Sequence, residues 1–279
     1  SNVVIEKENQ KAVIRYVSTN GNRVLTTDEV TGKSGEAIAY STTSQITEFK
    51  KQGYNLVSDE FTADGAKVYD YDTARDQVYT VTLSERVEPV NPDNPTPQPN
   101  TPVNPGQPDS PRWPGTVENL DNKESVSRTI HYVYEDGSKA KDDVVETLNF
   151  KRWSNINLVT GHIDFQDWTT NDDTFDKVVS PTIAGYTADK SEIPAVSGVK
   201  AKDQDRVETV TYRKDAQKAV IRYVSTNGNR VLTTDEVTGK SGEAIAYSTT
   251  SQINEFKKQG YNLVSDEFTA DGAKVYDYD

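Results

Sequence analysis

Aromatic and acidic side chains gather between Lys151 and Asp176, and these residue types could bind a carbohydrate. An aromatic ring stacks on the apolar C–H face of a sugar, while Asp and Asn side chains hydrogen-bond with its hydroxyl groups. Both tryptophans of this stretch could equally be core or lid residues. The candidate glycan-binding residues are Trp153, Trp168, Asp167, Asn171 and Tyr186.

The stretch DWTTNDDTFD also offers hard oxygen atoms of the kind that calcium prefers. The candidate metal ligands are Asp172, Asp173 and Asp176. Their spacing does not match an EF-hand loop, which also requires a glycine and a glutamate that this stretch lacks. A solvated acidic loop is therefore the alternative interpretation, and no other cofactor is predicted.

No catalytic constellation is present in the sequence. The two histidines, His131 and His162, lie in a predicted strand and beside a predicted turn, where structural roles are expected. The absence of cysteine excludes disulfides, thiolate metal sites and cysteine nucleophiles. A serine elbow, a phosphate-binding glycine loop and an HExxH motif are also absent. We therefore predict a protein that is not an enzyme and has no catalytic residues.

Composition narrows the choice of partners. The 279 residues carry a formal net charge of −13 at pH 7, and only 33% of them are hydrophobic. Nucleic acids and anionic membranes require clustered Lys and Arg, so neither is expected as a partner. No apolar run reaches the roughly 18 residues of a membrane span, so no membrane insertion is expected within this segment. The low apolar content favours several small domains with thin cores, and the lack of a visible signal peptide suggests a segment of a longer protein.

A long internal repeat organises the chain. Residues 10–72 and 217–279 are identical except that Thr47 becomes Asn254. A duplication that preserves surface and core alike multiplies one surface instead of creating another. Weak binding sites gain avidity from such multiplication, whereas catalytic domains gain little. The repeat therefore favours a multivalent extracellular binder, and a stalk whose domains supply only length is the alternative.

Each copy carries the pattern of a small α+β domain. Asn20-Gly21 is a hairpin turn between two strand-like runs. Thr42 and Gln45 have capping-box spacing, and Gly53 suits the left-handed position beyond a helix of about ten residues. The expected strands are 12–17, 24–30, 54–57 and 78–83. This ββαββ order predicts a β-grasp, ubiquitin-like fold, in which the first and last strands lie side by side and parallel.

A proline-rich segment follows the first copy. Ten of the twelve prolines lie between Pro89 and Pro114. Such spacing excludes a helix or a central strand and favours an extended polyproline II conformation. We therefore expect residues 88–115 to form an extended linker, with Trp113 free to pack on the next domain.

The middle segment is a diverged relative of the two copies. Three landmarks of the first copy recur in the middle segment in the same order: a strand followed by a turn glycine, a Gly-Tyr pair and a late strand. In the middle segment these landmarks are 130–133 with Gly137, Gly185-Tyr186 and Val207–Tyr212. The same sheet is therefore predicted, although this segment is longer and no helix pattern fills the additional length.

These patterns predict an α+β protein of tandem β-grasp (ubiquitin-like) domains in an elongated array, whose middle domain is longer and richer in β-structure. The expected boundaries are 1–87 for the first β-grasp module, 88–115 for the linker, 116–214 for the middle domain and 215–279 for the second copy. The second copy has no counterpart of residues 78–83. We expect an open sheet edge there, with lower stability than in the first copy or with a strand borrowed from elsewhere.

A set of residues in the middle segment carries a family resemblance. They are Ile130, Tyr132, Asp136-Gly137, Phe150, Arg152, Thr160-Gly161, Trp168, Ser180-Pro181, Gly185-Tyr186-Thr187 and Val210-Thr211-Tyr212. With them the segment resembles a mucus-binding repeat (MucBP or Mub type) of lactic acid bacterial cell-surface adhesins. The first segment resembles the β-grasp module that precedes this domain in the longer form of the repeat.

The resemblance implies an extracellular protein, sortase-anchored to the cell wall of a Gram-positive bacterium, that binds the glycans of mucin glycoproteins. The resemblance identifies no catalytic motif and no ligand-binding residue in this sequence. The β-grasp module is also similar in topology to small immunoglobulin-binding domains of Gram-positive surface proteins, so non-immune immunoglobulin binding is a second hypothesis. An inert surface stalk or spacer is the third.

Overall fold

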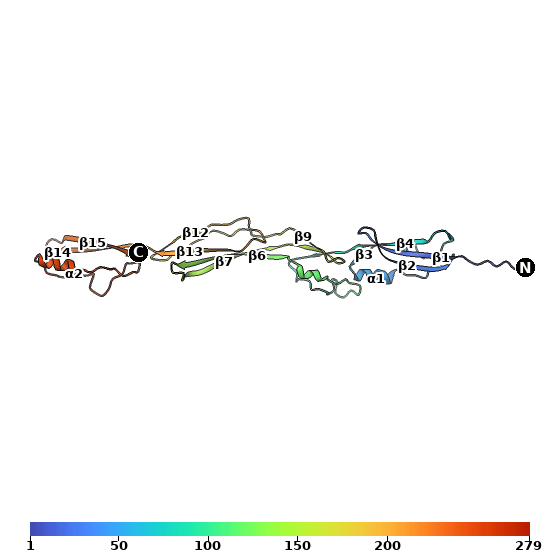
Figure 1. The fold of residues 1–279 in the computed structure, drawn as a ribbon, viewed down its shortest axis with the longest axis horizontal. Coiled ribbons are helices and arrows are strands. Elements are labelled where there is room, and N and C mark those ends of the chain that lie inside the picture. Colours follow the sequence, from blue (N-terminus) through green and yellow to red (C-terminus); the bar gives the residue numbers. More distant parts are fainter. The chain divides into compact units, whose positions relative to one another are not determined.

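The computed structural model describes residues 1–279, which divide into two compact units. The first unit comprises residues 1–124 and 150–171, and the second comprises residues 125–149 and 172–279. Both units consist mainly of β-structure, and each contains one α-helix (Figure 1). Neither helix has the length and apolar character needed to cross a membrane.

The first copy folds into a four-stranded sheet. Its strands are β1 (Asn9–Ser18), β2 (Arg23–Lys33), β3 (Tyr54–Asp59) and β4 (Gln77–Glu85). They lie in the order β2-β1-β4-β3, with β1 and β4 parallel and the two outer strands antiparallel to their neighbours. The predicted parallel pairing of the first and last strands is therefore confirmed.

Helix α1 (Thr43–Lys51) covers one face of this sheet. Its Ile46 and Phe49, three residues apart on one helical face, join a buried cluster with Ile14, Tyr16 and Leu83 of the central strands. The strand residues alternate along the chain, as the period of two requires for one buried sheet face. The first copy therefore has a complete core of its own.

Both ends of α1 are tied to other parts of the first unit. Thr42 is the N-cap residue, but its side chain makes no capping hydrogen bond, so the expected capping box does not form. Its hydroxyl instead donates to Asp59 Oδ2 at the end of β3, at 2.6 Å. Beyond the helix, Gly53 has φ = +104°, as its predicted left-handed position requires.

Residues 88–115 do not form the extended linker that the prolines predict. β5 (Val87–Val90) is the edge strand of a small antiparallel sheet with β8 (Ser154–Asn157) and β9 (Ile163–Phe165). An edge strand tolerates Pro89 because proline donates no ladder hydrogen bond. After β5 the chain folds back on itself, since the Trp113 N–H donates to the Thr101 carbonyl at 2.9 Å.

Burial of apolar side chains explains this correction. A 3₁₀ helix, η1 (Gly115–Asn119), follows the turn and contributes Val117. Val117 packs with Val90, Ile156 and Leu158 in a core that Trp113 partly covers. An extended rod would leave these side chains in water, so their burial favours the folded arrangement.

The middle segment repeats the sheet of the first copy. β6 (Lys123–Tyr134), β7 (Lys139–Lys151), β11 (Tyr186–Ala188) and β13 (Arg206–Lys214) lie in the order β11-β13-β6-β7, with β13 parallel to β6. No α-helix occurs between β7 and β11. β10 (Val178–Val179), which precedes β11, pairs with β12 (Glu192–Ile193), which follows it, and Ile193 enters the core of this sheet. The strand order and the parallel central pair therefore match those of the first copy, as predicted.

A buried arginine fastens the long connection of the second unit to this sheet. The side chain of Arg128 on β6 is fully buried, and its Nη1 donates to the Pro194 carbonyl at 2.8 Å. Its Nη2 donates to Glu146 Oε1 at 2.7 Å and to the Asp176 carbonyl. The guanidinium also lies 5.2 Å from the ring centroid of Phe175. One cation therefore holds three separate chain segments together.

The second copy has fewer strands than the first. β14 (Ala216–Ser225) and β15 (Arg230–Lys240) form a two-stranded sheet, and helix α2 (Thr250–Lys258) follows. Residues 261–279 contain no strand, and α2 has no buried residue. Ile221 is only half-buried, whereas its counterpart Ile14 is fully buried. The lower stability of this copy stays a prediction.

Candidate functional site

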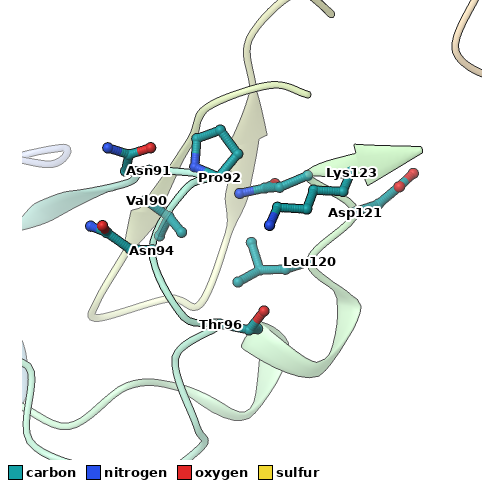
Figure 2. A pocket seen from close by; sticks show the side chains of 9 residues that line it. Val90, Asn91, Pro92, Asn94, Thr96, Leu120, Asp121 and Lys123 are labelled. Atoms are coloured by element: carbon teal, nitrogen blue, oxygen red, sulfur yellow. The ribbon is translucent and has the colours of Figure 1, made fainter. Parts of the chain in front are cut away.

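A pocket of about 170 Å³ opens in the first unit beside β5. It lies between the turn after β5 and the segment that leads from η1 into β6 (Figure 2). Val90, Pro92 and Leu120 form its apolar floor, and Val90 belongs to the core shared with β8. The volume corresponds to roughly six water molecules. A single ring-sized ligand therefore matches the pocket better than an extended chain.

Several polar groups of the pocket have no hydrogen-bond partner within the chain. The side chains of Asn94, Thr96 and Lys123 make no hydrogen bond or ion pair. Asn91 uses its Oδ1 to accept a backbone N–H at 2.9 Å, which leaves its Nδ2 unpaired. Asn122 donates through Nδ2 to a serine, but its Oδ1 is buried without a partner. Together they offer both donors and acceptors to a polar ligand.

The carboxylates next to the pocket are already paired with cations. Asp121 Oδ2 lies 3.3 Å from Arg152 Nη2, and Asp93 Oδ1 lies 3.0 Å from Lys151 Nζ. Figure 2 shows the Lys123 side chain reaching into the pocket, whereas the Asp121 carboxylate points away from it. The ammonium group of Lys123 is therefore the uncompensated charge of the pocket.

Arg152 occupies one face of Trp168, a predicted glycan-binding residue. Its guanidinium carbon lies 4.1 Å from the Trp168 ring centroid and 3.8 Å from that of Phe165. Its Nε also donates to the Asp121 carbonyl at 2.8 Å. A cation at this distance is attracted to the aromatic face. Trp168 is half-buried in this stack, so its glycan-binding role stays a prediction with one ring face already in use.

Trp153 is more accessible, with 43% of its surface exposed. Its backbone carbonyl accepts the N–H of Gln166 at 2.9 Å, which holds the tryptophan beside β9. The predicted residues Asp167 and Asn171 are also exposed and belong to the same unit. These candidates, together with Trp168, offer aromatic and hydrogen-bonding groups within one compact unit.

Tyr186, the remaining glycan-binding candidate, lies on β11 in the second unit. Its ring packs against Tyr134, with the two ring centroids 4.9 Å apart. It is half-buried and belongs to the aromatic face of that sheet. Its packing therefore accounts for an aromatic residue at this position without a ligand.

The three candidate metal ligands are exposed and do not converge. Asp172 Oδ1 accepts the N–H of Thr174 at 3.0 Å, and Asp173 Oδ1 accepts the hydroxyl of the same threonine at 2.9 Å. Asp176 contributes its backbone carbonyl to Arg128. No group of three or more His, Asp or Glu side chains is placed to hold a metal ion. The calcium interpretation therefore gains no support from the geometry.

The pocket itself could not be recognised from residue types. Asn91, Asn94 and Thr96 lie among the prolines that predict a linker, and Lys123 begins a strand about thirty positions later. A signal was nevertheless present in the apolar residues Val90 and Trp113. An extended linker has no core in which to bury such side chains.

Two sheets of matching strand order define the class of this chain; a helix packs on one of them, and the short β10–β12 pair packs on the other. It is an α+β protein, mostly β, built of related repeat domains. The model of the Muc B2-like domain matches residues 117–216, and the model of the mucin binding domain matches residues 10–85 and 217–279. The chain belongs to the family of mucin-binding repeat domains.

Several solved structures are similar to parts of this chain. The crystal structure of Mub-RV is 26% identical and covers 74% of this chain and 99% of its own, with a TM-score of 0.58. The type 2 repeat of the mucus binding protein MUB from Lactobacillus reuteri is 27% identical in sequence, with a TM-score of 0.48. The match covers 74% of this chain and 100% of that repeat. The MucBP domain of an adhesion protein from Pediococcus pentosaceus is 37% identical in sequence, with a TM-score of 0.30. The match covers 33% of this chain and 98% of that domain. No curated protein matches the chain.

Proposed function

We propose that this chain is a repeat segment of a bacterial surface adhesin that binds mucin glycoproteins through their glycans. The observation that carries the proposal is the match of mucin-binding family models to residues 10–85, 117–216 and 217–279. The protein would act outside the cell and be attached to the cell wall. Its two related sheets would be β-grasp domains, since each places its first and last long strands parallel at the centre.

The duplication supports a binding role through avidity. Residues 10–72 and 217–279 present nearly the same side chains twice in one chain. Mucins display many copies of the same sugars, so several weak contacts made by one chain raise the overall affinity without any new contact. An adhesin of this kind does not need a deep, high-affinity site in any single domain.

The purified chain tests the proposal on immobilised mucin. Periodate oxidises vicinal diols of sugars and leaves the mucin polypeptide largely intact, so oxidation of the mucin should abolish most of the binding. Mucin carried through the same steps without periodate is the control. Equal binding before and after oxidation would overturn the glycan proposal. If residues 10–86 capture antibodies, and removal of the glycans does not change this capture, the segment recognises protein instead of glycan.

A further inference from the structure

We infer that the pocket beside β5 binds one anionic sugar residue, a pyranose that carries a carboxylate or a sulfate group, with Lys123 as its charge partner. The inference rests on the proposed glycan-binding function and names both a site and a ligand class for it. It concerns the polar pocket of the first unit, whose walls come from residues 90–96 and 120–123.

Charge is the first argument. The chain carries a net charge of −13, which disfavours the approach of anions overall. At the pocket, however, the carboxylate of Asp121 is paired with Arg152, and that of Asp93, the residue after Pro92, is paired with Lys151. Lys123 is left without a partner and reaches into the cavity (Figure 2). A hydrogen bond between an ammonium and a carboxylate or sulfate is about twice as strong as a neutral one. An anionic group is therefore preferred here over a neutral hydroxyl.

The neutral polar groups indicate that the anion belongs to a sugar. A simple inorganic ion would need only the lysine and one or two donors. The pocket also offers the amides of Asn91 and Asn94 and the hydroxyl of Thr96, all available as donors. The buried Oδ1 of Asn122 needs a donor, because a buried acceptor without one is costly. A ring with several hydroxyl groups can supply both donors and acceptors.

The apolar floor supplies the remaining part of a sugar site. Val90, Pro92 and Leu120 line the same pocket, and the C–H face of a pyranose can pack against them. A neighbouring cavity of about 190 Å³ shares Val90, Asn91 and Asn94 with the first and adds three prolines and Trp113. The next residue of a glycan can rest there against an aromatic ring.

The test uses the full chain and three soluble probes. They are lactose, lactose with a sulfate group on its galactose, and lactose with a terminal sialic acid, which carries a carboxylate. NMR titration suits affinities in the millimolar range. We expect both anionic probes, or one of them, to bind more tightly than lactose, and Lys123→Gln to weaken that binding about tenfold. Lys123→Arg retains the positive charge and should therefore reduce the affinity for the anionic probes less than Lys123→Gln does.

A matched control separates local charge from net charge. Lys51 belongs to the same unit and lies exposed beside Glu48, outside the pocket. Lys51→Gln changes the net charge of the chain by the same amount as Lys123→Gln and should leave the affinity for every probe unchanged. Equal losses from the two substitutions would overturn the pocket assignment, as would equal binding of lactose and both anionic probes.

Mucin binding distinguishes failure of this inference from failure of the proposed function. Pretreatment of mucin with sialidase removes the carboxylate source, and pretreatment with sulfatase removes the sulfate source. A loss of Lys123-dependent binding in either arm supports the inference and identifies the anion. If the chain binds mucin but neither enzyme nor Lys123→Gln changes that binding, the inference fails and the proposed function stands. If anionic probes bind through Lys123 but mucin does not bind, the inference stands and the proposed function fails.

Discussion

Replacing Gly53 with alanine should destabilise the first unit, whereas the same change at Gly260, its counterpart in the second copy, should not affect that unit. Both glycines have positive φ values, +104° and +98°, so both substitutions introduce backbone strain of about 1–2 kcal/mol. Only Gly53 faces another segment closely. A Cβ there would lie 2.7 Å from the carbonyl carbon of Leu158, whereas nothing lies within 4 Å of a Cβ at Gly260.

The close contact at Gly53 cannot be relieved without moving well-packed backbone. The Leu158 N–H donates to the Arg86 carbonyl at 2.9 Å, and the Leu158 side chain is buried in the core beside Ile156. Overpacking of this kind costs about 1–3 kcal/mol. We therefore expect Gly53→Ala to lower the free energy of unfolding by about 2–5 kcal/mol, when strain and overlap are combined. Gly260→Ala carries only the strain.

Tryptophan fluorescence in urea measures this difference. All three tryptophans, Trp113, Trp153 and Trp168, belong to the first unit, so their signal reports on that unit alone. Gly53→Ala should lower the urea midpoint of the fluorescence transition, and Gly260→Ala should leave it unchanged. Circular dichroism follows both copies and shows whether the second variant is folded. Equal shifts of the fluorescence midpoint in the two variants, or no shift in either, would show that the contact between Gly53 and Leu158 does not limit the side chain at position 53.

Truncation of Arg128 to alanine leaves two backbone carbonyls and one carboxylate without their donor, so we expect a loss of about 3–5 kcal/mol in the second unit. Hydrogen exchange should then quicken in residues 172–196, and unchanged protection there would contradict this account. The pH dependence of the first unit follows from Asp59. Burial raises the pKa of its carboxyl, but hydrogen bonds from Thr42 and Thr62 outweigh this and hold the pKa below its usual value. A depressed folded-state pKa stabilises the fold above the unfolded pKa of about 3.9, and this stability is lost as pH falls through the folded value. The urea concentration at the unfolding midpoint should therefore decrease as the pH is lowered below about 4, and this decrease should be less steep in Asp59→Asn. The same dependence on pH in both proteins would count against the role of this carboxyl.

The elements of the first copy were predictable because their signals are local. The β-branched run before Asn20-Gly21 predicts β1 and its hairpin, and Gly53 marks the end of α1 at a positive φ. The parallel pairing of β1 with β4 follows from the ββαββ order, which places the first and last strands side by side. The hydroxyl of Thr42 was not predictable in the same way. Its acceptor, Asp59, is remote in sequence and competes with the local cap.

The candidate site was predictable only in part. Aromatic and acidic residue types single out Trp153, whose glycan-binding role stays a prediction, but no property of Trp168 alone reveals that Arg152 is stacked on its ring. Proline content predicts backbone stiffness and says little about where a chain turns. The folding of residues 88–115 depends on a core completed by Ile156, a residue of another strand.

Residue types and their order are enough to predict the internal repeat, the α+β class and the resemblance to mucus-binding repeats, and they contain no recognisable catalytic motif. The tertiary structure decided how far the smaller sheet of the second copy exposes its side chains, since Ile14 is buried and the equivalent Ile221 is only half-buried. It likewise decided that Lys123 points into a pocket with Asn94. Proximity between segments far apart in the chain is a property of packing, and no local pattern encodes it.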